Sequence, residues 1–262
     1  MGKEINMNFL EVKNLTIQFG GLMAVDHVNF SVKEGQIVSI IGPNGAGKTT
    51  IYNMLTGVYK PTEGEILFGE NRVDLMSPEE IVKIGMARTF QNIRLFPDMR
   101  VIENVMVGTH TRLSYSLLDE IFHTKKYRTM EYEKRNHGKE LLEQVGLLHR
   151  LNDYAGNLPY GEQRKLEIVR AIATGAKLLL IDEPAAGMNP YESEELRKFI
   201  LLLKDKGYTI LLIEHDMNVV MSISDYIYVL DYGKKIAEGL PKDIQNNKEV
   251  LTAYLGESEE SE

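Results

Sequence analysis

The sequence predicts an α/β protein in which a sheet is flanked by helices. Short runs of apolar residues are typical of strands that are buried on both faces of a parallel sheet. Between these runs, apolar residues recur at the spacing of amphipathic helices. Strands that alternate with helices along the chain indicate a doubly wound core. The apolar runs are residues 37–41, 178–181, 210–213 and 226–230.

The N-terminal region departs from this pattern and favours antiparallel strands. Between residues 9 and 32, apolar and polar residues alternate, which is typical of strands with one buried face. Gly20 and Gly21 divide the region and supply a turn. We therefore expect an antiparallel β subdomain beside the core.

The first unit of the core is a strand that leads into a helix. Residues 37–41 (IVSII) are apolar on both faces, and Gly42 follows them. A helical pattern begins at Lys48, with apolar residues at i, i+3, i+4 and i+7: Ile51, Met54, Leu55 and Val58.

The middle of the chain has few strand patterns and a long charged segment typical of helices, residues 125–140. We interpret residues 86–158 as an α-helical subdomain inserted into the core. The core then comprises residues 1–85 and 159–262, and the whole chain, 1–262, is one domain. Two helix starts are also predicted, a capping box at residues 77–80 and an N-cap at Asn189 followed by Pro190.

Composition excludes several classes of protein. The absence of cysteine excludes disulfides, thiolate metal sites and cysteine catalysis. A net charge of −8 argues against a surface that coats nucleic acid or adheres to anionic lipid. The apolar runs are far shorter than the ~18 residues that span a bilayer, and no signal-peptide pattern opens the chain.

One motif predicts a phosphate site. GPNGAGKT, at residues 42–49, fits G-x-x-x-x-G-K-[ST] and lies between a buried strand and a helix, which is its functional context. Backbone N–H groups and the helix N-terminus attract phosphate oxygens, Lys48 reaches the β- and γ-phosphates, and the Thr49 hydroxyl can ligate Mg²⁺. We therefore predict binding of a nucleoside triphosphate through Gly42, Pro43, Asn44, Gly45, Ala46, Gly47, Lys48, Thr49 and Thr50.

Chemically active side chains follow two further predicted strands. Asp182 and Glu183 come after residues 178–181, and His215 comes after residues 210–213. Ligands bind in the crevice outside the carboxyl ends of parallel strands. We expect Asp182 to hold the hydration shell of Mg²⁺ opposite Thr49, and Glu183 to act as general base on the attacking water. A neutral imidazole at His215 could donate to the γ-phosphate.

These motifs, in this order, resemble the ATP-binding subunit of an ABC transporter over nearly the whole chain. GPNGAGKT resembles the Walker A motif, LLLIDE the Walker B motif, and residues 185–189 the D-loop. The resemblance implies the fold of the P-loop ABC ATPases, a mixed sheet flanked by helices with an antiparallel β subdomain and an inserted α-helical subdomain. It also implies that Gln91 is the Q-loop glutamine that contacts metal and γ-phosphate, that Phe19 stacks on adenine, and that His215 is the switch histidine.

LPYGEQ, at residues 158–163, occupies the position of the LSGGQ signature. In this family the signature of one subunit closes the nucleotide site of the other, so the resemblance implies that Tyr160, Gly161 and Glu162 contact nucleotide bound to a partner. The sequence departs from the pattern at Pro159, which replaces the signature serine, and at Tyr160, which replaces its first glycine. Asn189 stands where the D-loop has aspartate.

The resemblance also implies partners and a location. These are a second ABC ATPase subunit (a paralogue or another copy), transmembrane permease subunits, and indirectly an extracytoplasmic substrate-binding protein, but no nucleic acid. The chain would then be peripheral, at the cytoplasmic face of the cell membrane. A coupling helix of the permease is expected to dock beside the Q-loop, where residues 96–99 (FPDM) of this chain would contact it.

Several strings, among them ARTFQNIRLF and LPYGEQRKLEIVRA, are similar to the first of the two ATPase subunits of branched-chain amino-acid importers. Related ATPases of urea or amide importers and of lipopolysaccharide exporters are alternatives. A soluble ABC ATPase that acts on DNA or ribosomes is disfavoured by the acidic balance and by the short stretch between Gln91 and the signature. A nucleotide-dependent interaction module without turnover is disfavoured by Glu183.

Overall fold

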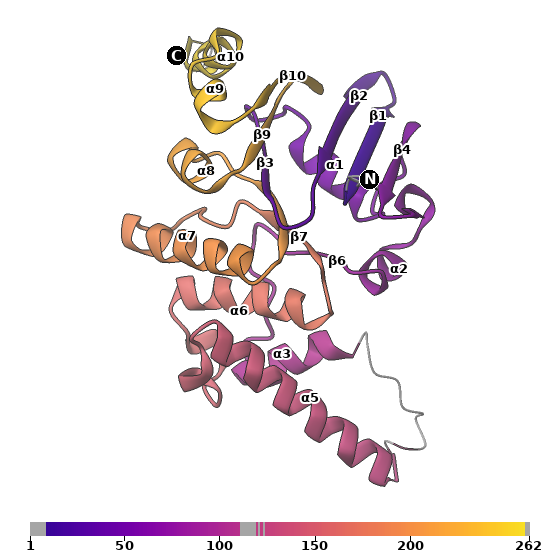
Figure 1. The fold of residues 1–262 in the computed structure, drawn as a ribbon, viewed down its shortest axis with the longest axis vertical. Coiled ribbons are helices and arrows are strands. Elements are labelled where there is room, and N and C mark those ends of the chain that lie inside the picture. Colours follow the sequence, from indigo (N-terminus) through magenta and orange to yellow (C-terminus); the bar gives the residue numbers. More distant parts are fainter. Residues whose placement is uncertain (1–8, 111–118, 120, 123, 260–262) are drawn as a thin grey trace, which may run out of the picture.

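The computed structural model describes residues 9–110, 119, 121–122 and 124–259 of the chain. Within these ranges the strands form one sheet of four strands and one of six. The six-stranded sheet lies between the four-stranded sheet and a stack of helices (Figure 1). This arrangement confirms the predicted fold class, an α/β core with an antiparallel subdomain and a helical region.

The four-stranded sheet has the strand order β2-β1-β4-β5 and is antiparallel throughout. Its first two strands meet at the pair Phe19 and Leu22, so Gly20 and Gly21 form the turn, as predicted. Its other two strands were not identified from sequence. The four strands are β1 (Leu10–Phe19), β2 (Leu22–Val32), β4 (Glu63–Phe68) and β5 (Asn71–Arg72).

The six-stranded sheet has the order β10-β9-β3-β8-β7-β6. Five strands are parallel and β10 is an antiparallel edge strand, so the sheet is mixed. The strands are β3 (Ile37–Ile41), β6 (Met86–Arg88), β7 (Leu178–Asp182), β8 (Thr209–Ile213), β9 (Tyr226–Asp231) and β10 (Lys234–Gly239).

One boundary differs from the sequence-based expectation. Residues 86–88, expected in the helical subdomain, form β6 and pair with β7 in the six-stranded sheet. The inserted helices therefore begin after Arg88. Three residues of mixed polarity (MAR) are too short to show a strand period, so the pairing with β7 decides this segment.

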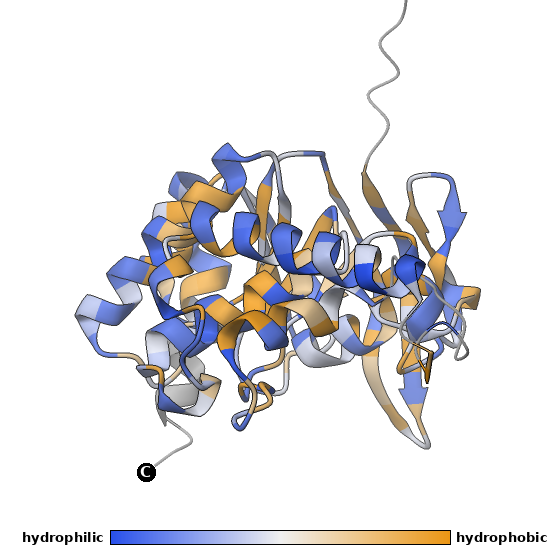
Figure 2. Cartoon of the chain, turned by 90° about the horizontal axis from the view of Figure 1, so that it is seen from below, coloured by the Kyte–Doolittle hydropathy of each residue, from blue (hydrophilic) through white to orange (hydrophobic). Residues whose placement is uncertain are grey.

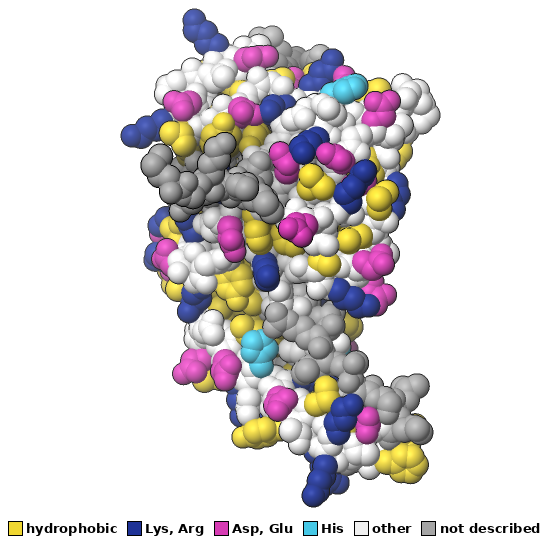
Figure 3. Space-filling view, turned by 45° about the vertical axis from the view of Figure 1, so that its right-hand side comes forward, with side chains coloured by type: hydrophobic (Ala, Val, Ile, Leu, Met, Phe, Trp, Pro, Cys, Tyr) yellow, Lys and Arg dark blue, Asp and Glu magenta, His cyan; other side chains and the backbone are white. Residues whose placement is uncertain are grey.

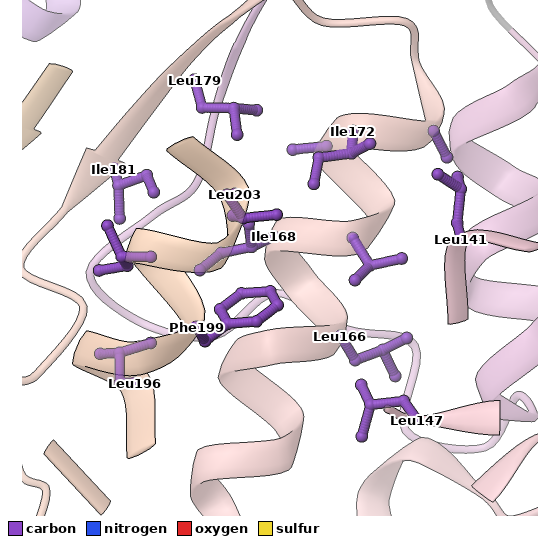
Figure 4. Packing of buried hydrophobic residues seen from close by; sticks show 14 of the residues in the cluster. Leu141, Leu147, Leu166, Ile168, Ile172, Leu179, Ile181, Leu196, Phe199 and Leu203 are labelled. Atoms are coloured by element: carbon purple, nitrogen blue, oxygen red, sulfur yellow. The ribbon is translucent and has the colours of Figure 1, made fainter. Parts of the chain in front are cut away.

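Both faces of the central strands are buried, as the apolar runs predicted. Along β7, Leu178 and Leu180 pack toward α1 (Lys48–Leu55) and the four-stranded sheet, whereas Leu179 and Ile181 pack toward the helical stack. Figure 4 shows this second core, in which Phe199 lies between neighbouring helices. Figure 2 shows hydrophobic residues concentrated on the inner strands and on one side of the helices.

Helices α3, α5 and α6 pack on one another, and α6 also packs on α7. Both predicted caps are present: Ser77 with Glu80 and Asn189 with Glu192 form reciprocal capping boxes. The remaining helices are α2 (Pro78–Lys83), α3 (Val101–Thr109), α5 (Lys125–Gln144), α6 (Tyr160–Ala173), α7 (Pro190–Asp205), α8 (Met217–Ile223), α9 (Pro241–Gln245) and α10 (Lys248–Glu259), with 3-10 turns η1 (Val73–Leu75), η2 (Leu148–Arg150) and η3 (Ala155–Asn157). In the part of the chain that the structure describes, no helix has the length and apolar character needed to cross a bilayer.

Candidate functional site

The predicted functional segments meet at one edge of the six-stranded sheet. β3, β8 and β7 are adjacent and parallel, so their carboxyl ends lie side by side (Figure 1). The glycine-rich loop follows β3, Asp182 is the last residue of β7, and His215 lies two residues beyond β8. The topology thus brings together residues that are far apart in sequence.

The glycine-rich loop has a backbone that only glycine accommodates at two points. Gly42 has φ +150°, and a Cβ there would lie 2.1 Å from the carbonyl oxygen of Leu230. Gly47 has φ +98°, and its Cβ would lie 2.7 Å from the carbonyl oxygen of Ala24. Side chains are therefore excluded at both positions. Lys48 lies buried within the loop, and its Nζ donates to the carbonyl oxygens of Gly42 (2.5 Å) and Pro43 (2.7 Å).

A cavity of about 510 Å³ opens over this loop, which is the size of a small-molecule site. Residues 44–50 line it, together with Glu183 and Phe19, the last residue of β1. The Phe19 ring is 44% exposed and meets Tyr59 edge to face, with 5.3 Å between ring centroids. The contact with Tyr59 thus positions the Phe19 ring beside the glycine-rich loop, with part of the ring exposed to solvent.

Asp182 is buried and paired with an arginine that sequence reasoning missed. Arg88, the last residue of β6, donates from Nη2 to Asp182 Oδ2 at 2.6 Å. Its Nη1 donates to Asn53 Oδ1 on α1 at 2.7 Å. The carboxylate is thus fixed in orientation at the end of β7, and Arg88 joins it to α1.

Two other predicted site residues, Gln91 and His215, lie beside Glu183. Its φ is +42°, a left-handed conformation that costs a non-glycine residue of order 1 kcal/mol and is found most often at functional sites. Gln91 Nε2 donates to Glu183 Oε2 at 2.6 Å, and His215 Nδ1 lies 3.8 Å from the same oxygen. The carboxylate, amide and imidazole are therefore close enough to act on one small molecule.

A second arginine missed from the sequence holds the segment of Gln91 in place. Arg164, on α6, is fully buried and donates to the backbone carbonyl oxygens of Phe90 and Gln91, both at 2.6 Å. Glu167 accepts from Arg164 Nη1 at 2.8 Å and offsets its charge. The helix that begins at the signature position therefore also supports the Q-loop of the same chain.

The signature residues lie elsewhere. Tyr160, Gly161 and Glu162 are absent from the lining of the cavity over the glycine-rich loop. Tyr160 donates from its hydroxyl to the carbonyl oxygen of Ala186 at 3.2 Å, and Glu162 pairs with Arg150 at 3.0 Å. Within one chain, the structure does not bring these residues to the phosphate loop.

The two missed arginines left only weak signals in the sequence. Arg88 stands three residues before Gln91. A charged side chain that is buried in a protein is nearly always paired with an opposite charge. Arg164 comes directly after the signature position, and nothing in the helical pattern around it indicates that its side chain is buried. Neither partner could be identified without the pairing of β6 with β7 and the packing of α6.

Comparison with known proteins agrees with this geometry. Residues 25–186 match the profile of the ABC transporter family, and residues 234–260 match that of the branched-chain amino acid ATP-binding cassette transporter. The chain is 47% identical over 250 residues to the high-affinity branched-chain amino acid transport ATP-binding protein LivG of Salmonella typhimurium, covering 95% of this chain and 98% of that protein. BraF of Pseudomonas aeruginosa, described in the same words, is also 47% identical with the same coverage.

Solved structures show the same similarity. An ATP-binding cassette of an ABC transporter in its ADP conformation superposes with a TM-score of 0.83 at 34% identity, covering 95% of this chain and 99% of that one. A dimeric ATP-binding cassette, bound to ADP and phosphate after hydrolysis, superposes with a TM-score of 0.71 at 27% identity, covering 88% and 98%.

Proposed function

The chain belongs to the family of ABC transporter ATP-binding proteins, and from that premise we propose that it is the ATP-hydrolysing subunit of an importer for branched-chain amino acids. The observation that carries the proposal is the cavity over the glycine-rich loop, which Lys48 and Glu183 line. His215 lies outside its lining, with Nδ1 3.8 Å from the Glu183 carboxylate. A loop that only binds phosphate needs no carboxylate and imidazole beside it.

The residues of the candidate site would divide the work as follows, with Gln91 and His215 acting through their position beside Glu183. Residues 42–50 would hold the triphosphate through backbone N–H groups, with the Lys48 ammonium offsetting negative charge. Phe19 would stack on the adenine ring. Glu183 would accept a proton from the attacking water, and Gln91 and His215 would orient that water and the γ-phosphate.

The donor atoms of the site also suit Mg²⁺. The Thr49 hydroxyl, the Asp182 carboxylate and the Gln91 amide oxygen are hard oxygen donors, the type that Mg²⁺ prefers. Among the described residues, no three histidine, aspartate or glutamate side chains form a group that could hold a metal ion. When bound, Mg²⁺ would neutralise negative charge on the phosphates.

A dimer would complete the site. The signature residues Tyr160, Gly161 and Glu162 lie outside the cavity of their own chain, so we propose that they close the site of a second ATPase subunit. The dimeric cassette among the similar structures supports this arrangement. A paralogous ATPase is the partner we favour, because the similarity is to one of two different importer subunits.

The chain would work at the cytoplasmic face of a membrane with separate permease subunits, and indirectly with an extracytoplasmic substrate-binding protein. The described helices offer no span of their own. The loop after Gln91 exposes Phe96 and Met99, which we propose as contacts of the permease. Figure 3 shows a face on which Lys and Arg are interspersed with Asp and Glu, a distribution that does not favour nucleic acid.

The cargo rests on the relatives alone, since no atom of a phosphate site contacts a transported molecule. LivG and BraF are branched-chain amino acid transport proteins, and the C-terminal match is to the same class. We therefore propose leucine, isoleucine and valine as cargo.

Calorimetry with Mg·ATP on the purified chain, and phosphate-release assays on the chain assembled with its partner subunits, test the enzyme proposal. We expect Lys48→Ala to weaken ATP binding, and Glu183→Gln to retain ATP binding while hydrolysis is lost. Binding that is unchanged in Lys48→Ala would contradict the proposal. For cargo, uptake of labelled leucine and of urea should be compared in source cells that carry the wild-type chain or Glu183→Gln; loss of urea uptake alone would refute the assignment.

A further inference from the structure

Glu214 is a fully buried carboxylate to which the roles above assign nothing. It follows Ile213, the last residue of β8, and none of its surface is exposed. Burial raises the pKa of its carboxyl, and three backbone N–H donors oppose that rise. Within the described residues its Oε2 lies 3.8 Å from His215 Nδ1, and it pairs with no lysine or arginine. A buried acid with so little cationic support is costly to maintain.

The carboxylate joins two loops that approach the site from different strands. Oε1 accepts from the backbone N–H of Ala185 at 2.9 Å, in the segment between β7 and α7. Oε2 accepts from the backbone N–H of His215 at 3.0 Å and of Asp216 at 3.4 Å, in the segment between β8 and α8. One side chain thus satisfies donors from both loops.

The two loops carry the groups that act on the γ-phosphate. Ala185 lies two residues after Glu183, and the N–H of Ala186 donates to the carbonyl oxygen of Glu183 at 3.2 Å. The same loop ends at Asn189, the cap of α7, and contacts Tyr160 through Ala186. A shift of this loop would therefore move Glu183, and through Glu214 it would also move His215.

We propose that Glu214 is a positioning residue that fixes the loop of residues 183–189 to the loop of His215, so that the two move as one unit. This inference rests on the proposed ATPase function. Only a carboxylate, with two acceptor oxygens, serves both loops. In glutamine, the amide NH₂ would face an N–H donor on one side, so one of the two connections would be lost whichever way the amide turned.

The test compares Glu214→Gln with a matched control, Asp74→Asn, which changes another buried carboxylate that accepts a backbone N–H, from Ile66, in the four-stranded sheet. We expect Glu214→Gln to lower kcat at least tenfold while the Kd for ATP stays within twofold. Asp74→Asn should leave both within twofold. An unchanged kcat, or a Kd that weakens in proportion to kcat, would overturn the proposal.

Amide hydrogen exchange on the nucleotide-free chain gives a readout independent of activity. In Glu214→Gln, exchange should accelerate at Ala185, or at His215 and Asp216, while Asp74→Asn leaves these amides unchanged. If the wild-type chain binds no ATP, the proposed function fails. The proposed connection is tested separately: exchange in Glu214→Gln at the wild-type rate at all three amides would refute it. Glu214→Asp, one methylene shorter, serves the same tests if the glutamine variant does not fold.

Discussion

Arg88 donates a hydrogen bond to Asp182 across 2.6 Å, between the ends of the neighbouring strands β6 and β7. The two side chains are only 9% and 6% exposed. The other arm of the guanidinium donates to Asn53 on the helix that follows the glycine-rich loop. Gln91 lies three residues beyond Arg88, so the strand that leads into the Q-loop is joined directly to the acidic residue of the site.

Arg88→Met should destabilise the fold by about 3–5 kcal/mol, since it keeps much of the side-chain volume but leaves the Asp182 charge buried without its partner. Urea denaturation followed by circular dichroism measures the loss. The double variant Arg88→Met/Asp182→Asn should recover a large part of it, because neither charge is then left alone. If the two single losses simply add, the pair is not coupled. Lys83→Met, which breaks the exposed pair with Glu79, should cause almost no change.

Asp74 should make stability depend on pH in the acidic range. Burial favours its neutral form, but hydrogen bonds from Arg72 and from the backbone N–H of Ile66 outweigh burial and hold the pKa below its usual 3.8. The folded pKa is thus below the unfolded one, so the carboxylate contributes stability above about pH 4 and loses it as the pH falls through the folded value.

The free energy of unfolding should therefore differ most between wild type and Asp74→Asn near pH 7, and the difference should shrink as the pH falls below 4. Denaturation curves at a series of pH values measure it. A difference that stays constant from pH 7 to pH 3 would show that the pKa of Asp74 is not lowered by folding. Arg72→Met removes the main hydrogen-bond donor to Asp74. Its difference from wild type in the free energy of unfolding should therefore also shrink as the pH falls below 4.

Much of the core and the shape of the glycine-rich loop could be predicted because their signals are local. An apolar run, a glycine-rich turn and a helical period follow one another between residues 37 and 55, and each has a single structural meaning. The expected apolar face extended one turn too far, because α1 ends at Leu55 and Val58 is 57% exposed. Asp182 and His215 were predictable because strand ends of one parallel sheet must share an edge. The capping box at Ser77 and the N-cap at Asn189 were likewise predicted from adjacent residues, whereas the reciprocal bond from Asn189 to Glu192 was not.

The remaining features depend on contacts between distant segments. Residues 86–88 form the strand β6 because they pair with β7. The same pairing places Arg88 within hydrogen-bond distance of Asp182. Arg164 reaches the backbone of Gln91 across 73 positions of sequence, and Glu214 reaches Ala185 across 29. No period or motif in one segment specifies the partner in another, so these roles emerge only from the folded structure.

Phe19→Ala should weaken ATP binding by about 1–3 kcal/mol, the range for stacking of a base on an aromatic side chain, or roughly 5- to 150-fold in Kd. Phe19 lines the cavity over the glycine-rich loop, and its contact with Tyr59 is edge to face, so a ring face is left for the base. Calorimetry with ATP and with inorganic tripolyphosphate separates the two parts of the site. Only ATP should bind more weakly to Phe19→Ala, because tripolyphosphate has no base to stack, and Phe19→Tyr should bind both like wild type. Equal loss for the two ligands would mean that Phe19 supports the loop rather than the adenine, and no loss for either would remove Phe19 from the site.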